Sequence, residues 1–69
     1  MDQHELILNY LEEHGSISPM EAFMHFGITK LSTRISEMRR KGIEFSKEWE
    51  TSKNRYGRPV TYMRYRKVS

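Results

Sequence analysis

TKLSTRISEMRRKG, residues 29–42, is the stretch that decides the fold, because it reads as a short helix with two unlike faces. At about 100° per residue, Leu31, Ile35 and Met38 fall within roughly 60° of one another, which predicts one buried stripe. Gly42 then ends the helix as a residue that tolerates a left-handed backbone. The cations that suit the negative end of the helix dipole come just before it: Arg39, Arg40 and Lys41.

The opposite side of this helix has an unusual composition for a surface that needs only solubility. Such a surface usually carries Glu and Lys, whereas here small hydroxyl side chains stand among basic ones. The outer face holds Thr29, Thr33, Ser36 and Arg40. It is flanked by Ser32 and Arg39 on one side and by Lys30 and Glu37 on the other. Small polar groups let a backbone come close to a partner surface. This face is therefore predicted to be a contact surface for another molecule.

The chain of 69 residues predicts one small domain, near the size at which a single core supplies only a few kcal/mol. It has no cysteine, which excludes disulfides, thiolate zinc sites and thiol nucleophiles. The longest apolar run, residues 6–8, is far shorter than the ~20 residues that span a bilayer, and no signal-peptide pattern precedes it. We therefore expect a soluble, cytoplasmic protein with no membrane partner.

The net charge of +3 hides a strong separation of charge along the chain. Residues 1–29 contain five acidic residues and no Lys or Arg, whereas residues 30–69 contain all 12 Lys and Arg. A polyanion would be drawn to the second part and repelled by the first, which would orient the protein as it approached.

Two further helices are predicted before residue 29. The first runs from a cap at Asp2 to about His14, with Glu5 placed as in a capping box, and Gly15 stops it. Its apolar stripe is Leu6, Ile7, Tyr10 and Leu11. Residues 16–17 form a connector, which we expect to be able to pair as a short third strand at a sheet edge.

The second helix begins at Ser18-Pro19-Met20-Glu21, which combines an N-cap Ser, a Pro at the first helical position and a Glu at the third. Its buried side is predicted to be Ala22, Phe23 and Phe26. Gly27 then makes a short turn, and Thr29 is predicted to cap the next helix. Two short helices joined by such a turn have the dimensions of a helix-turn-helix.

After Gly42 the pattern indicates a β-hairpin. Ile43, Phe45 and Trp49 are spaced as one face of a first strand, and residues 60–65 form a second strand preceded by Pro59. Residues 50–58 form a long basic tip with Asn54 and Gly57 as positive-φ positions. The pattern does not decide which face of the second strand is buried: the face with Val60 and Tyr62, or the face with Met63 and Tyr65. Residues 67–69 are expected to fray.

The order of three helices and a hairpin predicts an α+β winged helix-turn-helix, whose third helix enters the DNA major groove and whose hairpin contacts the backbone or minor groove. Base readout is then assigned to Thr33, Ser36 and Arg40, with Lys30 and Ser32 at the groove margin. Backbone and wing contacts are assigned to Thr29, Arg39, Lys41, Lys53, Asn54, Arg55 and Arg58. Arg40 is the best candidate for a bidentate contact to guanine. The competing interpretation is a solvated basic face beside an ordinary polar loop.

The other groups of polar and aromatic residues give weaker indications of function. Glu21 and Arg34 form a possible structural pair, the alternative being that Arg34 contacts phosphate. His4, His14 and His25 match no metal-ligand spacing, and no catalytic arrangement or cofactor loop stands out, so neither an enzyme nor a small-molecule site is expected. Trp49, Tyr56, Tyr62 and Tyr65 either stack single-stranded bases or, as we favour, contribute Trp49 and one Tyr to the core.

The segments GSISPMEAFMHFGITKLSTRISEMRRKG and KNRYGRPVTYMRYR resemble a family of small winged helix-turn-helix proteins of phages and prophages. The family pattern reads G-S-I-T-P-x-E-A, then G-I-x-x-L-x-x-R-I, L-R-x-x-G, and a wing with G-x-x-x-x-Y-x-x-Y. Ser18 replaces the commoner Thr, and Met38 replaces the commoner Leu. The resemblance covers about residues 5–66 and implies a DNA-binding regulator or recombination accessory.

We therefore predict a sequence-specific binder of double-stranded DNA, acting as a phage or prophage regulator or an excisionase-like accessory, alone or as a homodimer. Two alternative functions remain open. One is a module that docks on a host or phage protein through the acidic first helix. The other is a binder of single-stranded nucleic acid.

Overall fold

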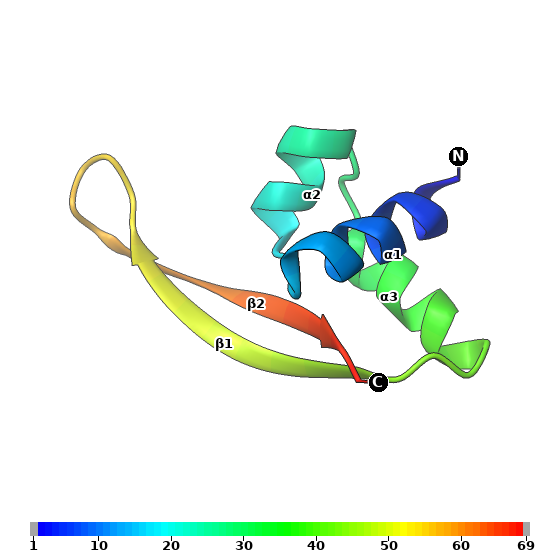
Figure 1. The fold of residues 1–69 in the computed structure, drawn as a ribbon. Helices are drawn as coiled ribbons and strands as arrows, with labels where there is room; N and C mark the ends of the chain where they lie inside the picture. Colours follow the sequence, from blue (N-terminus) through cyan, green and yellow to red (C-terminus); the bar gives the residue numbers. More distant parts are fainter. Residues whose placement is uncertain (1, 69) are drawn as a thin grey trace.

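The structure, a computed structural model, describes residues 2–68. Three helices, α1 (Gln3–His14), α2 (Pro19–Phe26) and α3 (Leu31–Arg40), pack into a body. Two antiparallel strands, β1 (Phe45–Lys53) and β2 (Pro59–Lys67), form a long hairpin that projects from the body (Figure 1). The predicted winged helix-turn-helix is confirmed. None of the helices in this part of the chain is long and apolar enough to cross a membrane.

The ends of α1 and α2 follow the predicted local chemistry. The carboxylate of Asp2 accepts the backbone N–H of Glu5 at 2.9 Å, and Gly15 ends α1 with φ of 84°. Ser18 and Glu21 form a complete capping box, in which the Ser18 hydroxyl accepts the Glu21 N–H at 3.2 Å and the Glu21 carboxylate accepts the Ser18 N–H at 2.9 Å. Gly27 follows α2 with φ of 68°.

The start of α3 differs from the prediction. Its N-cap is Lys30, which makes no side-chain capping bond, so Thr29 is not the cap, and the helix has 10 residues. Ile28 and Leu31 are both buried in the core, and this keeps the residues between them in the turn. At the other end, Gly42 has φ of 99°, and the N–H of Ile43 donates to the carbonyl of Met38 at 3.1 Å. This bond, with that from Gly42 to Arg39 at 3.0 Å, makes the predicted glycine stop a Schellman motif.

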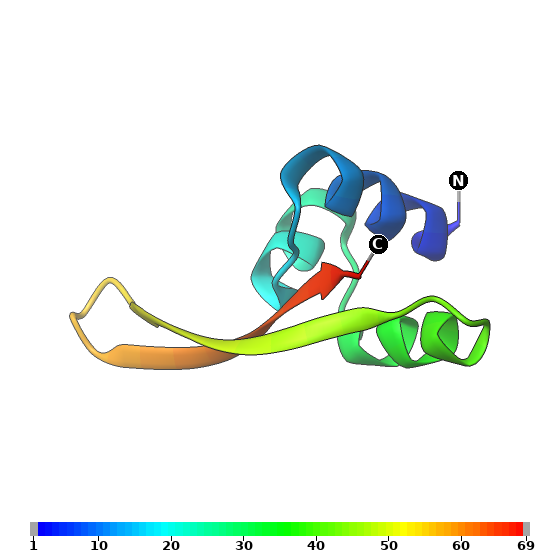
Figure 2. The same cartoon turned by 60° about the horizontal axis from the view of Figure 1, so that its bottom comes forward.

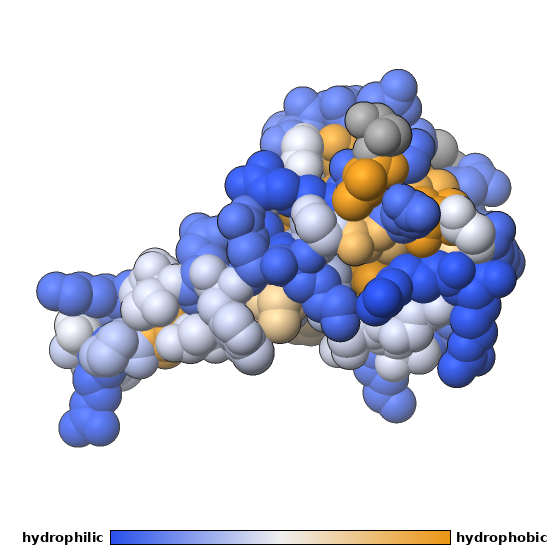
Figure 3. All heavy atoms as spheres, turned by 90° about the horizontal axis from the view of Figure 1, so that it is seen from below, coloured by the Kyte–Doolittle hydropathy of each residue, from blue (hydrophilic) through white to orange (hydrophobic). Residues whose placement is uncertain are grey.

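The core lies where the three helices meet the base of the hairpin. Its buried residues are Ile7, Leu11, Ile17, Ala22, Ile28, Leu31, Ile35, Met38, Phe45 and Tyr65. Figure 3 shows hydrophobic atoms gathered in the body, whereas the projecting wing is largely hydrophilic. The hairpin therefore depends on the body for its hydrophobic packing.

Two aromatic residues predicted to be buried are exposed. Phe23 is 56% exposed because α2 packs on the core through Ala22 and Phe26 instead. Trp49 is 70% exposed, although Met63, the residue opposite it on β2, packs against the core. Among the tyrosines, Tyr65 is the one that the core takes up.

The hairpin has longer strands and a shorter tip than predicted. Residues 50–53 belong to β1, which pairs with β2 from Phe45↔Lys67 to Lys53↔Pro59, so only residues 54–58 form the tip. Gly57 has the predicted positive φ of 77°, but Asn54 does not have one. Residues 67 and 68 are also paired, since the Val68 N–H donates to the Glu44 carbonyl at 2.9 Å; the predicted fraying of Ser69 lies outside the described residues.

The structure resolves the open question about the faces of β2. Tyr65 is buried and Met63 packs against the core, whereas Val60 is exposed. On the other edge of β2, Ile17 forms an isolated bridge to Tyr65, with backbone hydrogen bonds of 2.9 Å in both directions. The short third strand predicted at residues 16–17 is thus a bridge at Ile17, and it ties the connector between α1 and α2 to the base of the wing.

Candidate nucleic-acid interface

The outer face of α3 is open to solvent, as its sequence pattern predicts. Leu31, Ile35 and Met38 are almost fully buried and fix the rotation of the helix about its axis. The predicted base-reading residues, Thr33, Ser36 and Arg40, are exposed on the opposite face. The residues predicted to flank them are exposed too: Thr29, Lys30, Ser32, Arg39 and Lys41.

The single acidic residue of α3 is turned away from this outer face, toward α1. The carboxylate of Glu37 accepts a hydrogen bond from Nε2 of His4 at 2.8 Å, and Nδ1 of His4 accepts one from Lys41 at 3.4 Å. The hydrogen bond from His4, with the nearby charge of Arg34, holds the pKa of Glu37 below its ordinary value. Glu37 is therefore an anion that already has partners, and it adds little repulsion toward a polyanion at the outer face.

The predicted pair of Glu21 and Arg34 is wrong. The Nε atom of Arg34 lies 3.4 Å from the Glu37 carboxylate, on the flank of α3 that faces α1. Glu21 instead accepts a hydrogen bond of 2.9 Å from Arg64 of the wing. The pair does not form because the first turn of α2 faces the hairpin, whereas Arg34 faces the start of α1.

Arg64 connects the wing to the body. Its guanidinium donates to Glu21 of α2, to the Ser16 hydroxyl at 3.0 Å and to Glu50 on the opposite strand. Burial alone would lower the pKa of Arg64, but the hydrogen bonds to Glu50 and Glu21 outweigh this and raise it above its ordinary value. The fixed cation holds the hairpin against α2 at the point where the wing leaves the body.

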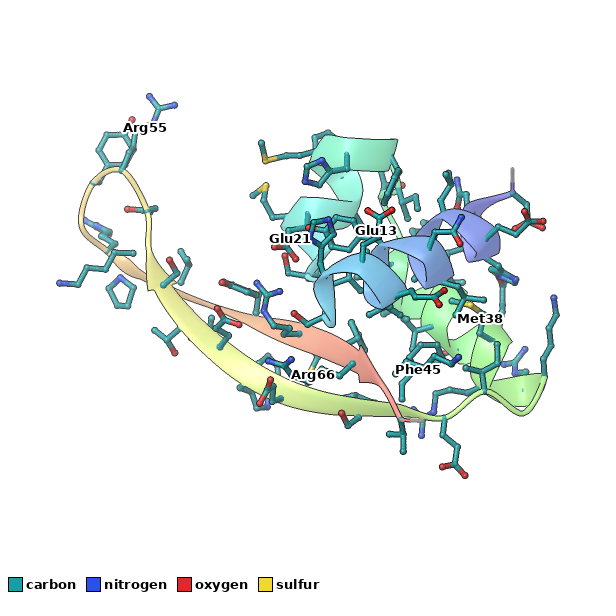
Figure 4. All side chains as sticks on the ribbon, viewed as in Figure 1. Glu13, Glu21, Met38, Phe45, Arg55 and Arg66 are labelled. Atoms are coloured by element: carbon teal, nitrogen blue, oxygen red, sulfur yellow. The ribbon has the colours of Figure 1, made fainter. Side chains whose placement is uncertain are left out.

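The wing tip presents cations on a loop that is organised by Asn54. The Asn54 side-chain oxygen accepts the backbone N–H groups of Tyr56 at 2.9 Å and Arg58 at 3.1 Å. This network is an Asx-type turn, so Asn54, predicted to contact DNA, also has a structural role in shaping the loop. Lys53, Arg55 and Arg58 are exposed, and Arg55 projects from the tip (Figure 4).

The basic elements lie together, away from the acidic one. Figure 2 shows α1 along the upper side of the molecule and α3 with most of the wing along the lower side. The exposed acids of α1 include Glu5, Glu12 and Glu13. The charge separation seen along the sequence is therefore also a separation in space.

The ion pairs divide the cations into two groups. Within residues 2–68, carboxylates pair with Arg34, Arg64 and Arg66, and with no other Lys or Arg. The predicted DNA-contacting cations are all in the unpaired group: Lys30, Arg39, Arg40, Lys41, Lys53, Arg55 and Arg58. Lys41 also donates to His4, whereas the other side chains of this group can exchange water and counterions for phosphate.

The aromatic residues of the hairpin do not form one stacking surface. Tyr65 is in the core, while Trp49 and Tyr62 occupy odd and even positions of the paired strands and so lie on opposite faces of the hairpin. Tyr56 is at the tip, beside Arg55. In the part of the chain that the structure describes, no three His, Cys, Asp or Glu side chains are grouped to hold a metal ion.

Sequence reasoning missed two contacts that shape this site: the Arg64 cluster and the contact between His4 and Glu37. The first depends on the hairpin register, in which Glu50 faces Tyr62 and lies diagonally from Arg64. A tip centred on residues 54–58 would have predicted that register. The contact between His4 and Glu37 joins residues 33 positions apart, and no local pattern in the sequence predicts it.

Comparison with known proteins agrees with this architecture. Residues 2–66 match the winged helix-turn-helix domain family, and the chain belongs to this family. Membership suggests DNA binding in general. Neither the curated proteins nor the solved structures yielded a match.

Proposed function

We propose that the protein binds double-stranded DNA sequence-specifically, with α3 in the major groove and the wing tip on the neighbouring backbone or minor groove. The observation that carries this proposal is the division of the cations. The predicted DNA-contacting cations on and beside α3 and at the wing tip have no carboxylate partner within residues 2–68, whereas Arg34, Arg64 and Arg66 are each paired with one.

The dimensions suit one turn of duplex DNA. At 1.5 Å per residue, α3 is about 15 Å long, and its hydroxyl-rich outer face fits a major groove about 12 Å wide. The long axis of the molecule is 39 Å, close to the ~34 Å of one helical turn. A wing tip at one end of this axis therefore reaches the DNA beyond the groove that α3 occupies.

The roles of the residues follow from their chemistry. Arg40 offers a planar fork for guanine, while Thr33 and Ser36 offer short hydroxyl groups to base edges. Lys53, Arg55 and Arg58 at the wing, with Lys30, Arg39 and Lys41 around α3, neutralise phosphates. The acidic α1 faces away, which favours approach in one orientation.

In the cell, we propose a non-enzymatic role as a phage or prophage regulator or excisionase-like accessory in the cytoplasm of a bacterial host. The support is the resemblance of the helix-turn-helix and wing segments to that family. Selection of bound fragments from random duplex would reveal the site and its symmetry.

Titration of labelled duplex by fluorescence anisotropy at several salt concentrations tests the DNA interface. Binding should weaken steeply with salt, and Lys53→Ala or Arg55→Ala should each reduce the slope by about one unit, because each removes a phosphate contact. Arg40→Ala should cost about 1–3 kcal/mol on the preferred site and relax its base preference.

Lys67→Ala is the matched control, because it removes the same charge from the side of the molecule near α1. Lys67 borders a hollow that it shares with Leu8, Leu11 and Glu12. Its loss should leave the salt slope nearly unchanged. Absence of duplex binding at low salt, or an equal effect of Lys67→Ala and Arg55→Ala, would contradict the proposal.

A further inference from the structure

The two faces of the wing hairpin carry different chemistry. In the strand register, odd-numbered residues of β1 and β2 lie on one face and even-numbered residues on the other. The charged residues of the even face are joined in cross-strand ion pairs: Glu48 with Arg66 and Glu50 with Arg64. The odd positions carry cations and no acid: Lys47, Lys53 and Lys67. The odd face is therefore positively charged, while the charges of the even face cancel.

Part of the odd face lies open to solvent. Its exposed members in the middle of the hairpin, which we call the Trp49 face, are Lys47, Trp49, Thr51 and Thr61. Met63, opposite Trp49, packs against the core, so this face starts beside the body and not at the tip. Within residues 2–68, no carboxylate pairs with Lys47. The Trp49 face therefore offers a free ammonium group, hydroxyl groups and an indole ring to a partner.

The Trp49 face lies between the two surfaces that the proposed function assigns to DNA. At its inner end, Phe45 lies on the same side of β1 and borders a hollow that it shares with Arg39 of α3. At its outer end, Thr51 is followed on that side by Lys53, where the wing tip begins. A DNA backbone that touches both α3 and the tip therefore passes along the Trp49 face.

The even face of the outer hairpin is turned toward α2. Ser52, Val60 and Tyr62 border a hollow of about 350 Å³ that they share with the start of this helix. Lys53, at the end of β1, also borders the hollow, whereas no member of the Trp49 face does. The Trp49 face is therefore directed away from α2, and the helix does not block it.

The side chains of the Trp49 face favour one kind of partner. Ammonium, hydroxyl and indole N–H groups all donate hydrogen bonds, which phosphate oxygens accept, and the indole ring adds an apolar surface. Stacking a row of single-stranded bases would need several exposed aromatic rings along the strand. On the odd face, Tyr65 is buried and Trp49 is the one exposed ring. The set therefore fits the sugar–phosphate backbone of a duplex better than it fits unpaired bases.

From these observations we infer that the Trp49 face is a third DNA contact, which binds the sugar–phosphate backbone between α3 and the wing tip. Lys47 neutralises a phosphate, the threonines donate to phosphate oxygens, and the ring of Trp49 packs on a deoxyribose. The contact rests on the proposed binding of duplex DNA, since α3 and the tip hold the duplex against it. It adds affinity at every sequence, because backbone contacts carry no base information.

Trp49 is the only tryptophan of the chain, so tryptophan emission reports this face alone. Fluorescence anisotropy of a labelled duplex measures binding. Tryptophan emission and its quenching by acrylamide, recorded with the same duplex unlabelled, measure whether the DNA covers Trp49. Bound duplex should shift the emission and reduce the quenching, with the same midpoint as the anisotropy.

The two readouts separate failure of this inference from failure of the proposed function. Duplex binding by anisotropy without any change in Trp49 emission or quenching overturns the third contact and leaves those of α3 and the tip in place. Absence of duplex binding at low salt overturns both. A higher affinity for single-stranded DNA that Trp49→Ala abolishes would reveal a base-stacking platform, which also overturns contact with a duplex backbone.

Variants of the face should weaken binding without changing base preference. Lys47→Ala should lower the salt slope by about one unit, and Trp49→Ala should weaken binding roughly tenfold on any duplex. Val60→Ala is the matched control, since it removes an exposed apolar side chain from the even face, and it should bind like the wild type. Circular dichroism checks that each variant is folded. Wild-type binding by both Lys47→Ala and Trp49→Ala would contradict the contact.

Discussion

Ser18 and Thr29, both at helix starts, show that a hydroxyl residue caps a helix only where its side chain can accept a backbone N–H. Both are hydroxyl residues placed where a cap is expected. Ser18 accepts the Glu21 N–H and is 2% exposed, whereas α3 is capped by Lys30 without any side-chain bond. The difference arises in the turn, where the buried Ile28 sets the path of the chain past Thr29.

Ser18→Ala should lower the free energy of unfolding by about 0.5–2 kcal/mol, because it removes the N-cap acceptor of α2. Thr29→Ala should change it by less than about 0.5 kcal/mol, as for an ordinary surface substitution. Urea denaturation followed by circular dichroism measures both. Equal losses for the two variants would show that the assigned cap is wrong.

Glu21 links stability to pH. Partial burial by itself raises the pKa of Glu21, but hydrogen bonds from the Ser18 N–H and from Arg64 outweigh it and hold the pKa below its ordinary value. A carboxyl group with a lowered pKa in the folded state stabilises the fold above its ordinary pKa, and this stabilisation is lost as the pH falls through the lowered value.

Unfolding free energies measured from neutral pH down into the acid range should therefore decrease, and Glu21→Gln should flatten that decrease. Glutamine can still accept the capping hydrogen bond, so the variant removes the titrating charge more than the cap. Glu12→Gln on the exposed side of α1 serves as the control and should keep the wild-type pH profile. A Glu21→Gln profile identical to that of the wild type would contradict the assignment.

At the scale of elements, the wing depends on a few contacts to the body. Its outer half carries no buried residue, and β1 from Ser46 to Trp49 is exposed. The base is held by Phe45 and Tyr65 in the core, by the bridge at Ile17 and by the Arg64 cluster. These contacts near the base therefore set the direction in which the wing projects, and with it the position of the tip.

Arg64→Met should lower the free energy of unfolding by about 1–3 kcal/mol, because it leaves Glu21 and Glu50 without their shared cation. Arg64→Lys should recover only part of the loss, since an ammonium group lacks the planar fork. Chemical denaturation followed by circular dichroism gives the free energies, and amide hydrogen exchange at Ile17 and Tyr65 reports the base of the wing.

Arg66→Met is the control on the same strand. Its partner Glu48 lies 2.7 Å away, but both side chains are at least half exposed, so the pair should contribute no more than about 1 kcal/mol. An Arg66→Met loss as large as that of Arg64→Met would mean that Arg64 has no special role in holding the wing.

The whole molecule is a small body whose single core joins every helix to the base of the wing. Ile35 of α3 lies in a cluster that also contains residues of α1, α2, β1 and β2. A domain of this size has few buried side chains, so each one is a large share of the total stability. Helices and hairpin base should therefore unfold together.

Ile35→Ala should cost about 2–5 kcal/mol, enough to unfold much of the population at 25 °C. Ser36→Ala, one residue along on the exposed face, should stay within about 0.5 kcal/mol of the wild type. Thermal unfolding by circular dichroism and hydrogen exchange at the wing base should give the same transition. Separate transitions for helices and hairpin would contradict a single cooperative core.

Much of this architecture follows from short-range chemistry. The caps at Asp2 and Ser18, the stops at Gly15 and Gly42 and the buried stripe of α3 involve groups a few residues apart, so local patterns predict them. The outer face of α3 follows as well, because a helix with one buried stripe must expose the opposite side. The order of elements, the fold class and the exposure of the predicted base-reading residues could thus be read from the chain.

The tertiary structure alone decided which faces meet. The exposure of Phe23 and Trp49, the choice of Tyr65 for the core and the partners of Arg64 and Glu37 depend on hairpin register and on contacts between residues 33 to 48 positions apart. No local periodicity encodes such contacts, because an apolar or charged side chain satisfies the same pattern whichever neighbour it finds. Those long-range contacts hold the base of the wing against α2 and turn Glu37 toward α1.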